Sequence, residues 1–398
     1  MAANFAPFTI WTGDNLPVLR GMNSACVDLI YLDPPFNSNR TYEAPIGSKA
    51  AGASFKDAWT LSDVDVCEHG ELADRNPAVY AVITAARQAH GKGMQSYLVF
   101  MAVRLLEMHR ILKPTGSIYL HCDPTASHYI KLLMDGVFGK ERFRNEIIWS
   151  YRTGGVSRHY FARKHDVLFY YSGGSMFNMQ TEKAYTRSKN RKPGLVNYGA
   201  GKAMFYEDGN GIYNLVSMRD VWEIPYLNSQ AKERLGYPTQ KPLALLDPII
   251  KASSNPGDLV LDPFCGCATS LVAADRLGRQ WAGIDLSPLA IKLVKERIIA
   301  DNPLWAGPVA LDTPPSRTDL GDLPDYRTHR HRLYGEQEGV CVGCNTHFPF
   351  RVMDVDHILP RSKGGTDHPD NLQLLCSGCN RSKGSRTMAE WRAARQAP

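Results

Sequence analysis

The stretch that decides the fold is residues 28–38, which read DLIYLDPPFNS. The apolar residues of its first half, together with Val27, are mostly β-branched, aliphatic or aromatic, which is the composition of a strand buried in a parallel sheet. They are Val27, Leu29, Ile30, Tyr31 and Leu32. Pro34 and Pro35 then end the strand, because proline cannot donate a ladder hydrogen bond and its φ is fixed at about −65°. The result is a stiff polar loop that begins at Asp33, and the carboxyl end of a strand is where open α/β sheets bind ligands.

The composition predicts a protein of two domains without a membrane segment. The chain has 398 residues, which is enough for one large domain with a sizeable core and a second, smaller one. It has no apolar run of about eighteen residues and no leader-like N-terminus, so we expect a cytoplasmic protein with no membrane partner. Of the nine cysteines, five are expected to be reduced and the last four form two spaced pairs.

The net charge of +6 is unevenly distributed along the chain. Residues 151–202 carry ten Lys and Arg against two Asp and Glu, and residues 326–398 carry eleven against seven. The rest of the chain therefore has a charge near −6. Tyr, Phe and His are interleaved with the basic residues of the first segment, as in surfaces that neutralise phosphates, although solvated loops can carry the same charge. Nucleic acid is the expected partner.

Strands and helices alternate along the first 300 residues, which predicts an α/β sheet. The predicted strands are 8–11, 27–32, 117–121, 167–171, 259–261 and 281–284, and the predicted helices include 95–112, 126–138, 243–252, 268–277 and 288–300. Residues 301–325 are rich in Pro, Asp and Gly without periodicity, which is typical of a linker. We therefore predict a large domain at 1–300, a linker at 301–325 and a small domain at 326–398.

A second loop, within residues 256–288, has the layout of a Rossmann-type cofactor site. A predicted strand leads to Asp262, a turn with Gly266 leads into a helix, and a second strand ends in Asp285, nineteen residues after Gly266. Small residues in the turn let the backbone approach a ligand, and a carboxylate about 20 residues later can bond ribose hydroxyls. Taken alone, the same pattern also fits a tight strand–helix turn without a ligand.

Four motifs in a fixed order make the chain resemble the β class of DNA amino-methyltransferases. They are GD at 13–14, DPPF at 33–36, TQKP at 239–242 and LDPFCGCATS at 261–270. In this class the catalytic loop precedes the cofactor loop, which is a circularly permuted motif order. The resemblance covers about residues 8–300 and implies a Rossmann-like methyltransferase sheet that uses S-adenosylmethionine. One departure is Ala268, where the family usually has a second glycine, and it bears on cofactor affinity.

The resemblance also implies roles for single residues. Asp33 and the Pro34 carbonyl would each accept one N–H of a target amine, which frees the amine's lone pair to attack a methyl group. Pro35 would keep this loop stiff, and Phe36 would stack on a base flipped out of double-stranded DNA. For Asp14 a helix-capping role is an equal alternative. The implied cofactor-binding residues are Asp14, Thr239, Lys241, Asp262, Phe264, Gly266 and Asp285.

The methylated base is predicted by association and its sequence context is not predicted at all. In this family an Asp at the head of the catalytic loop goes more often with N6 of adenine than with N4 of cytosine, so Asp33 favours adenine. Either amine can bond the same two acceptors. Residues 150–222 occupy the place of the target recognition segment, but no residue code converts them into a DNA sequence.

The small domain carries a second chemistry. CVGC at 341–344 and CSGC at 376–379 are two C-x-x-C pairs in a reduced, basic chain, and such pairs favour one structural zinc over disulfides. The zinc ligands would be Cys341, Cys344, Cys376 and Cys379. Between and after the pairs lie DVDHILPRSKGGTDHPDNLQLL and NRSKG, which closely resemble the HNH nuclease motif over about residues 326–386.

The HNH resemblance implies a small ββα-metal domain with defined residue roles. His357 would be the general base that takes a proton from water, since histidine titrates near neutral pH. Asp356 and Asn380 would hold a divalent ion, with Mg²⁺ expected. Asn371 would orient the loop that carries His357. One such domain has one base and one metal, so a double-strand break would need a homodimer or two successive nicks.

Two functions from different classes fit the sequence. The first is a single-chain restriction–modification enzyme that methylates a site and cuts the same site when it is unmethylated. The second is a DNA methyltransferase, for adenine N6 or cytosine N4, whose C-terminal zinc module only binds DNA. Asp356, His357 and Asn380 favour the first, because a binding module has no need of a base beside a metal ligand. A third function, cleavage of modified DNA, stays open.

Overall fold

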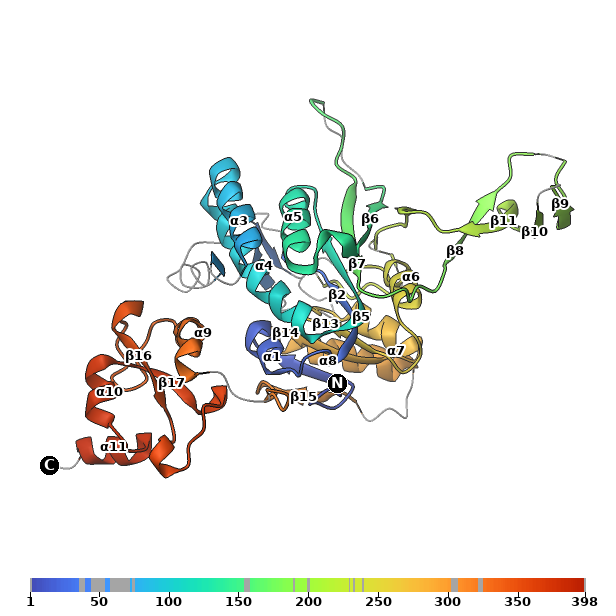
Figure 1. Cartoon of the computed structure of the whole chain (residues 1–398). Coiled ribbons are helices and arrows are strands. Elements are labelled where there is room, and N and C mark those ends of the chain that lie inside the picture. The colour runs from blue at the N-terminus through green and yellow to red at the C-terminus, as the bar shows by residue number, and fades with distance from the viewer. Residues whose placement is uncertain are drawn as a thin grey trace.

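The large domain is built on one mixed sheet, as the computed structural model of the chain shows (Figure 1). The structure describes residues 2–35, 40–43, 54–57, 72–73, 76–153, 158–188, 190–198, 201–228, 230–231, 233–237, 240–301, 307–320 and 325–396. Within these residues the strand order is β12-β6-β7-β5-β2-β13-β14-β1-β15. The strands from β5 to β15 run parallel, whereas β7 is antiparallel to both β5 and β6.

The bounds of these strands follow from their hydrogen bonding. They are β1 (Thr9–Thr12), β2 (Val27–Leu32), β5 (Leu112–Cys122), β6 (Phe143–Ser150), β7 (His165–Ser172), β12 (Val221–Glu223), β13 (Leu259–Asp262), β14 (Gln280–Asp285) and β15 (Val309–Leu311). A separate antiparallel pair, β3 (Arg40–Glu43) with β4 (Ser54–Asp57), lies between β2 and the next helix in the chain.

Helices cover both faces of the sheet and supply its two apolar cores (Figure 1). One face carries α1 (Asn15–Gly21), α3 (Pro77–His90), α4 (Lys92–Ile111) and α5 (Ser127–Phe138). The other face carries α6 (Leu243–Ser253), α7 (Thr269–Arg276) and α8 (Leu289–Asp301). In the described part of the chain no helix is both long and apolar enough to cross a membrane. The α/β fold class predicted from the alternating pattern is confirmed.

The predicted elements match the observed ones where the apolar signal is strong. The predicted strand 27–32 coincides with β2, and the predicted helix 95–112 is α4 shifted by a few residues. The strand β6 was not predicted. Residues 144–146 in its first half are exposed and polar, and only Ile147 and Trp149 of the strand are buried. This apolar run is too short to mark a strand without the pairing partner β7.

Residues 181–217 form a second sheet that stands apart from the large one (Figure 1). Its antiparallel strands are β8 (Thr181–Tyr185), β9 (Gly194–Asn197), β10 (Lys202–Asp208) and β11 (Gly211–Ser217). Basic side chains lie on aromatic rings here: Lys183 Nζ is 4.4 Å from the ring centre of Tyr213, and the Arg191 guanidinium is 4.6 Å from that of Phe205. Lys183 and Arg191 of the basic segment 151–202 thus lie on aromatic rings that follow this segment in the chain.

Residues 307–320 are bound along the large domain. After β15 has joined the sheet beside β1, this segment exchanges hydrogen bonds with the loop that follows α1. The Thr318 N–H donates to Oδ1 of Asn23 at 2.8 Å, and the Ser24 N–H donates to Oδ2 of Asp319 at 2.7 Å. This part of the segment predicted to be a linker is therefore fixed by specific contacts with the domain it leaves.

The small domain has its own apolar core. β16 (Met353–His357) and β17 (Leu372–Cys376) form an antiparallel pair, and α9 (Arg330–Glu336), α10 (Ser377–Lys383) and α11 (Met388–Gln396) surround it. Met353, Leu374 and Leu375 are fully buried between these elements. Its contact with the large domain includes the ion pair of Arg20 with Glu336, at 3.5 Å.

Trp391→Ala should unfold the small domain selectively. The indole of Trp391 is buried, and its Nε1 donates to the Ser382 hydroxyl at 3.0 Å, so the substitution removes a large part of a small core at a cost of about 3–5 kcal/mol. Differential scanning calorimetry should show one transition lowered or lost and the other unchanged. A single transition that shifts as a whole would contradict the prediction that the two domains fold separately.

Candidate functional site

Five parallel strands end at one edge of the large sheet, and polar residues follow each of them. β1, β14, β13, β2 and β5 are parallel, so their carboxyl ends meet at this edge. The residues at or just beyond these ends are Asp14, Asp285, Asp262, Asp33 and His121. The sheet thus brings the two predicted loops, which are far apart in the chain, to the same place.

The two carboxylate oxygens of Asp33, the predicted catalytic residue, differ in their hydrogen-bond partners. Oδ2 accepts a hydrogen bond from Nζ of Lys241 in an ion pair. Oδ1 is buried and lacks a hydrogen-bond partner among the described residues, although Nδ1 of His121 lies 3.8 Å away. A buried acceptor without a donor costs free energy. Oδ1 is therefore the atom of this site best suited to accept an N–H from a ligand.

His121 connects Asp33 with β7. It is fully buried, its Nδ1 lies 3.1 Å from the Tyr31 hydroxyl and its Nε2 lies 3.2 Å from Oδ2 of Asp166. The Tyr151 hydroxyl donates to the other Asp166 oxygen at 3.1 Å. Burial by itself raises the pKa of Asp166, but the hydrogen bond and charge of His121, together with Lys241 and Tyr151, outweigh burial and hold the pKa below its ordinary value. Asp166 thus remains an ionised acceptor that orients the imidazole.

The predicted cofactor loop has a left-handed backbone at two positions. Gly266 has a φ of +51°, and its N–H donates to Oδ2 of Asp285 at 2.8 Å, while Oδ1 accepts from the Ser287 N–H at 2.8 Å. Ala268 has a φ of +58°, a conformation that costs a non-glycine residue roughly 1–2 kcal/mol. This is the position at which the resembling family usually has glycine, so the backbone conformation explains that preference.

Asp262 is a buried carboxylate at the end of β13. Its Oδ1 accepts from the Phe264 N–H at 3.0 Å and its Oδ2 accepts from the Ser270 hydroxyl. Burial raises the pKa of Asp262 to about 7 and also raises the pKa of Asp285. Two acids that resist ionisation at one edge of a sheet favour a ligand that brings positive charge or hydroxyl donors.

Asp14 caps the N-terminus of α1, which is the alternative that the sequence offers to a cofactor-binding role. Its Oδ1 accepts from the Leu16 N–H at 3.0 Å and pairs with the Arg104 guanidinium at 2.8 Å. Arg104 in turn lies on the Phe100 ring, 3.5 Å from its centre. The Asp14 side chain is 53% exposed, so it remains accessible to a ligand as well.

Two of the predicted site residues, Phe36 and Thr239, lie outside the described residues. Pro34 and Pro35 are described and directly follow Asp33, with Pro34 buried. Sequence reasoning did not identify His121 or Asp166. For His121 there was a signal, because it ends the predicted strand 117–121. For Asp166 there was none, since only the antiparallel pairing of β5 with β7 brings it to the edge.

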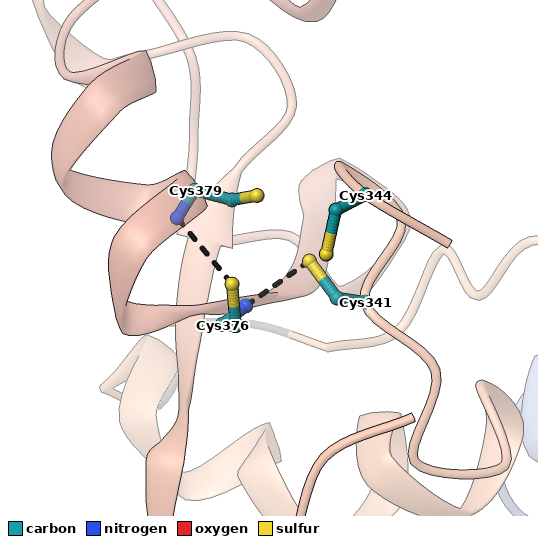
Figure 2. Close-up of side chains that lie close together, drawn as sticks. All are labelled: Cys341, Cys344, Cys376 and Cys379. Atoms are coloured by element: carbon teal, nitrogen blue, oxygen red, sulfur yellow. Dashed lines mark hydrogen bonds between the residues drawn. The ribbon is translucent and has the colours of Figure 1, made fainter. Parts of the chain in front are cut away.

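The four cysteines predicted to bind zinc converge in the small domain. Figure 2 shows their side chains directed toward one point, and their sulfur atoms lie within 4.8 Å of one another. The N–H groups of Cys376 and Cys379 donate to the sulfurs of Cys341 and Cys376, at 3.2 and 3.4 Å. All four cysteines, including Cys344, are free of disulfides. Four thiol groups on two short turns are a donor set that fits one tetrahedral zinc ion.

Asp356, predicted to bind a divalent metal, is buried in an ion pair. Its Oδ2 lies 3.0 Å from Nζ of Lys383 and accepts from the Gln373 amide at 2.8 Å. Lys383 is itself buried and also donates to the His357 carbonyl at 2.8 Å. Asn380, the second predicted ligand, lies half-buried on α10.

His357 is oriented by a residue that sequence reasoning did not identify. Its Nε2 lies 2.8 Å from Oδ1 of Asp367, which also forms a two-point pair with Arg361. The Arg361 hydrogen bond, with a smaller contribution from His357, lowers the pKa of Asp367. Asn371 accepts from the Leu359 N–H at 2.8 Å and donates to the loop at two carbonyls. These contacts are those expected of a residue that orients the loop after His357.

Comparison with known proteins gives two family matches. A family model for DNA methylases matches residues 27–296, and one for HNH endonucleases matches residues 341–386. The chain is 27% identical over 293 residues to the DNA adenine methyltransferase YhdJ of Escherichia coli (strain K12), covering 73% of this chain and 82% of that protein. It is 32% identical over 203 residues to the type II methyltransferase M.HpaI of Haemophilus parainfluenzae, covering 51% of this chain and 59% of that protein.

Solved structures are similar at lower identity. A DNA modification methylase candidate of Thermus thermophilus, complexed with S-adenosyl-L-methionine, is 18% identical and has a TM-score of 0.44. That comparison covers 76% of this chain and 98% of the Thermus protein.

The free energy of unfolding should depend on pH through Asp262. Its pKa is raised to about 7 in the folded chain, so the folded state holds a proton that the unfolded state loses above pH of about 4. Stability from this group is therefore present at low pH and lost as pH rises toward 7. Asparagine stays neutral, so the variant avoids this loss. The free energy of unfolding of Asp262→Asn should therefore exceed that of the wild type by an amount that grows to the order of a few kcal/mol between pH 5 and 8 in denaturant titrations. A pH-independent difference would contradict this assignment.

The chain should bind one zinc ion, and zinc should stabilise the small domain. Such a small domain has little apolar core, so metal binding should carry much of its folding free energy. Elemental analysis should give about one zinc per chain. Chelation should remove the circular dichroism signal of the small domain and leave the large domain folded. Absence of zinc, or loss of both domains together, would be evidence against a structural zinc site.

Proposed function

Because this chain belongs to the DNA methylase family and carries a C-terminal HNH endonuclease domain, we propose that it methylates N6 of adenine at specific sites in DNA and cuts DNA with its second domain. The observation that carries the first activity is the buried Oδ1 of Asp33, an acceptor without a donor in the described structure. Adenine is favoured by the Asp at the head of the DPPF motif and by the similarity to an adenine methyltransferase.

The residues at the sheet edge fit S-adenosylmethionine as the methyl donor. Its positively charged sulfonium and ammonium groups suit the buried acids, and its ribose hydroxyls suit Asp285. When bound, it supplies an electrophilic methyl group. In this proposal Asp285 holds the ribose, Asp14 the adenine amine, and Asp262 with Phe264 and Gly266 the methionine end.

The chain's own contribution to methyl transfer is the geometry of the target amine. An exocyclic amine is a poor nucleophile because its lone pair is delocalised into the ring of the base. Asp33 Oδ1 and the Pro34 carbonyl, held by the stiff loop with Pro35, each accept one N–H and draw the nitrogen toward tetrahedral geometry. The base has to leave the duplex to reach these acceptors, and Phe36 stacks on it in this proposal.

For the small domain we propose hydrolysis of a DNA phosphodiester with His357 as the general base. Asp367 binds one ring nitrogen of His357, which leaves the other nitrogen to take a proton from water. In this proposal Asp356 and Asn380 would hold Mg²⁺ through carboxylate and amide oxygens, the ligand types that the ion prefers. The ion would share the Asp356 carboxylate with Lys383, whose Nζ lies within hydrogen-bond distance of both oxygens. When bound, Mg²⁺ supplies charge stabilisation at the phosphate.

Joined in one chain, these activities make a restriction–modification enzyme that acts on double-stranded DNA. The division into 1–300, 301–325 and 326–398, with target recognition at about 150–222, is part of this proposal, as are a cytoplasmic location and a homodimer for double-strand cutting. The oriented pair of His357 and Asp367 favours this function over a zinc module that only binds DNA. A binding surface has no need of an imidazole held by a carboxylate.

The test uses unmethylated plasmid, S-adenosylmethionine and Mg²⁺. The wild type should produce N6-methyladenine, measured by mass spectrometry of nucleosides, and should cut plasmid that it has not methylated. Asp33→Ala should lose methylation by several orders of magnitude with nearly unchanged donor binding and should still cut. His357→Ala should methylate normally without cutting, whereas the control His347→Ala, outside the pair with Asp367, should do both.

Each part of the proposal has its own contrary result. N4-methylcytosine as the product would overturn the adenine assignment. Absence of cutting with Mg²⁺ or Mn²⁺ would favour the methyltransferase with a DNA-binding module. Preferential cutting of methylated plasmid would show that methylation does not protect the site.

A further inference from the structure

We propose that Lys241 is a positioning residue for Asp33, which it holds by one carboxylate oxygen so that the other oxygen faces the target amine. The inference rests on the proposed methyl transfer. It differs from the cofactor-binding role that the motif resemblance gives Lys241. Through Asp33, the TQKP segment would thereby help to position the target amine, which receives the methyl group.

The contact itself is close and largely shielded from water. The Lys241 side chain is 9% exposed and that of Asp33 is 16% exposed, and Nζ of Lys241 donates to Oδ2 of Asp33. These residues are 208 positions apart, and Lys241 lies just before α6, so only the tertiary structure joins them. Burying such a pair brings little net stability, because desolvation offsets the attraction. Stability is therefore a weak account of why a lysine lies here.

The pair has a geometric consequence for the carboxylate. Rotation about χ2 of an aspartate is broad, so the side-chain rotamer alone does not fix the plane of its two oxygens. A hydrogen bond from Lys241 to Oδ2 fixes that plane and directs Oδ1 away from the lysine. Oδ1 is the buried oxygen without a hydrogen-bond partner in the described residues. The lysine thus leaves one acceptor for one N–H of the amine.

The opposite side of the carboxylate is bounded by His121. Its Nδ1 lies 3.8 Å from Oδ1, and its other nitrogen is held by Asp166 at 3.2 Å. The imidazole is fully buried and edge-on to the Trp149 ring, with ring centres 5.6 Å apart, so it has little freedom to turn. Asp33 is therefore held by a bond on one side and bounded by a fixed ring on the other. Loss of Lys241 would leave the carboxylate free to rotate.

Lys241→Met should slow the chemical step without weakening donor binding. Methionine keeps most of the side-chain volume and removes the charge and the hydrogen bond. Because misplacement of a reacting group by about 1 Å can cost 100-fold in rate, the single-turnover methylation rate should fall about 100-fold. The dissociation constant of S-adenosylmethionine, measured by calorimetry, should stay within about twofold. Lys251→Met, an exposed lysine on α6, is the matched control and should match the wild type.

A double-mutant cycle separates positioning from general damage. If Lys241 acts through the Asp33 carboxylate, it has no further effect once that side chain is removed. The double variant Asp33→Ala with Lys241→Met should therefore be as slow as Asp33→Ala alone, within about twofold. Lys241→Gln keeps a donor without the charge and should lose less rate than Lys241→Met. It also serves as the test if circular dichroism shows that the methionine variant does not fold.

The contrary outcomes are distinct. A wild-type rate in Lys241→Met, or multiplicative losses in the double variant, would overturn the inference and leave the proposed function standing. Weaker donor binding with a normal rate at saturating donor would do the same and would support the cofactor-binding role. A wild-type protein that transfers no methyl group to DNA would overturn the proposed function and, with it, this inference.

Discussion

The parallel alignment of β1, β14, β13, β2 and β5 is the constraint on which the proposed methyl-transfer site depends. Parallel strands point their carboxyl ends to the same edge, so each loop that leaves such a strand begins beside the others. The double proline after Asp33 stiffens the loop that follows β2, and the left-handed turn at Gly266 lies in the loop that follows the neighbouring strand β13. Neither loop forms a site alone. The sheet supplies the proximity, and the loops supply the rigidity.

Both domains place a buried lysine–aspartate pair next to a histidine. In the large domain Lys241 binds Asp33, with His121 beside it; in the small domain Lys383 binds Asp356, which directly precedes His357 in the chain. Ion pairs of this kind gain little stability when buried but fix the orientation of the groups they join. Each histidine is in turn held by a second carboxylate, from Asp166 or Asp367. The buried polar groups thus set the geometry at two sites.

The segment between the domains takes part in the architecture. β15 extends the sheet, and the chain beyond it hydrogen-bonds to the loop after α1 before it reaches the small domain. Ser316 also donates to Asp370 at 2.6 Å, close to the loop that Asn371 orients. The helix α1, which is capped by Asp14, ends near this segment, because the Asn4 amide donates to the carbonyls of both Gly21 and Ser316.

Local sequence determined the elements with a strong apolar signal and the cysteine pairs. It also determined the double-proline loop after Asp33 and the glycine turn at Gly266. β2, α4 and the Cys-x-x-Cys turns are encoded within a few consecutive residues, so they are readable without knowledge of the fold. The tertiary structure decided which charged groups meet. Asp166 reaches His121 only through the antiparallel register of β7 on β5, and Lys241 reaches Asp33 across 208 residues. Partners of buried charges are set by strand order and register, and these depend on the whole sheet.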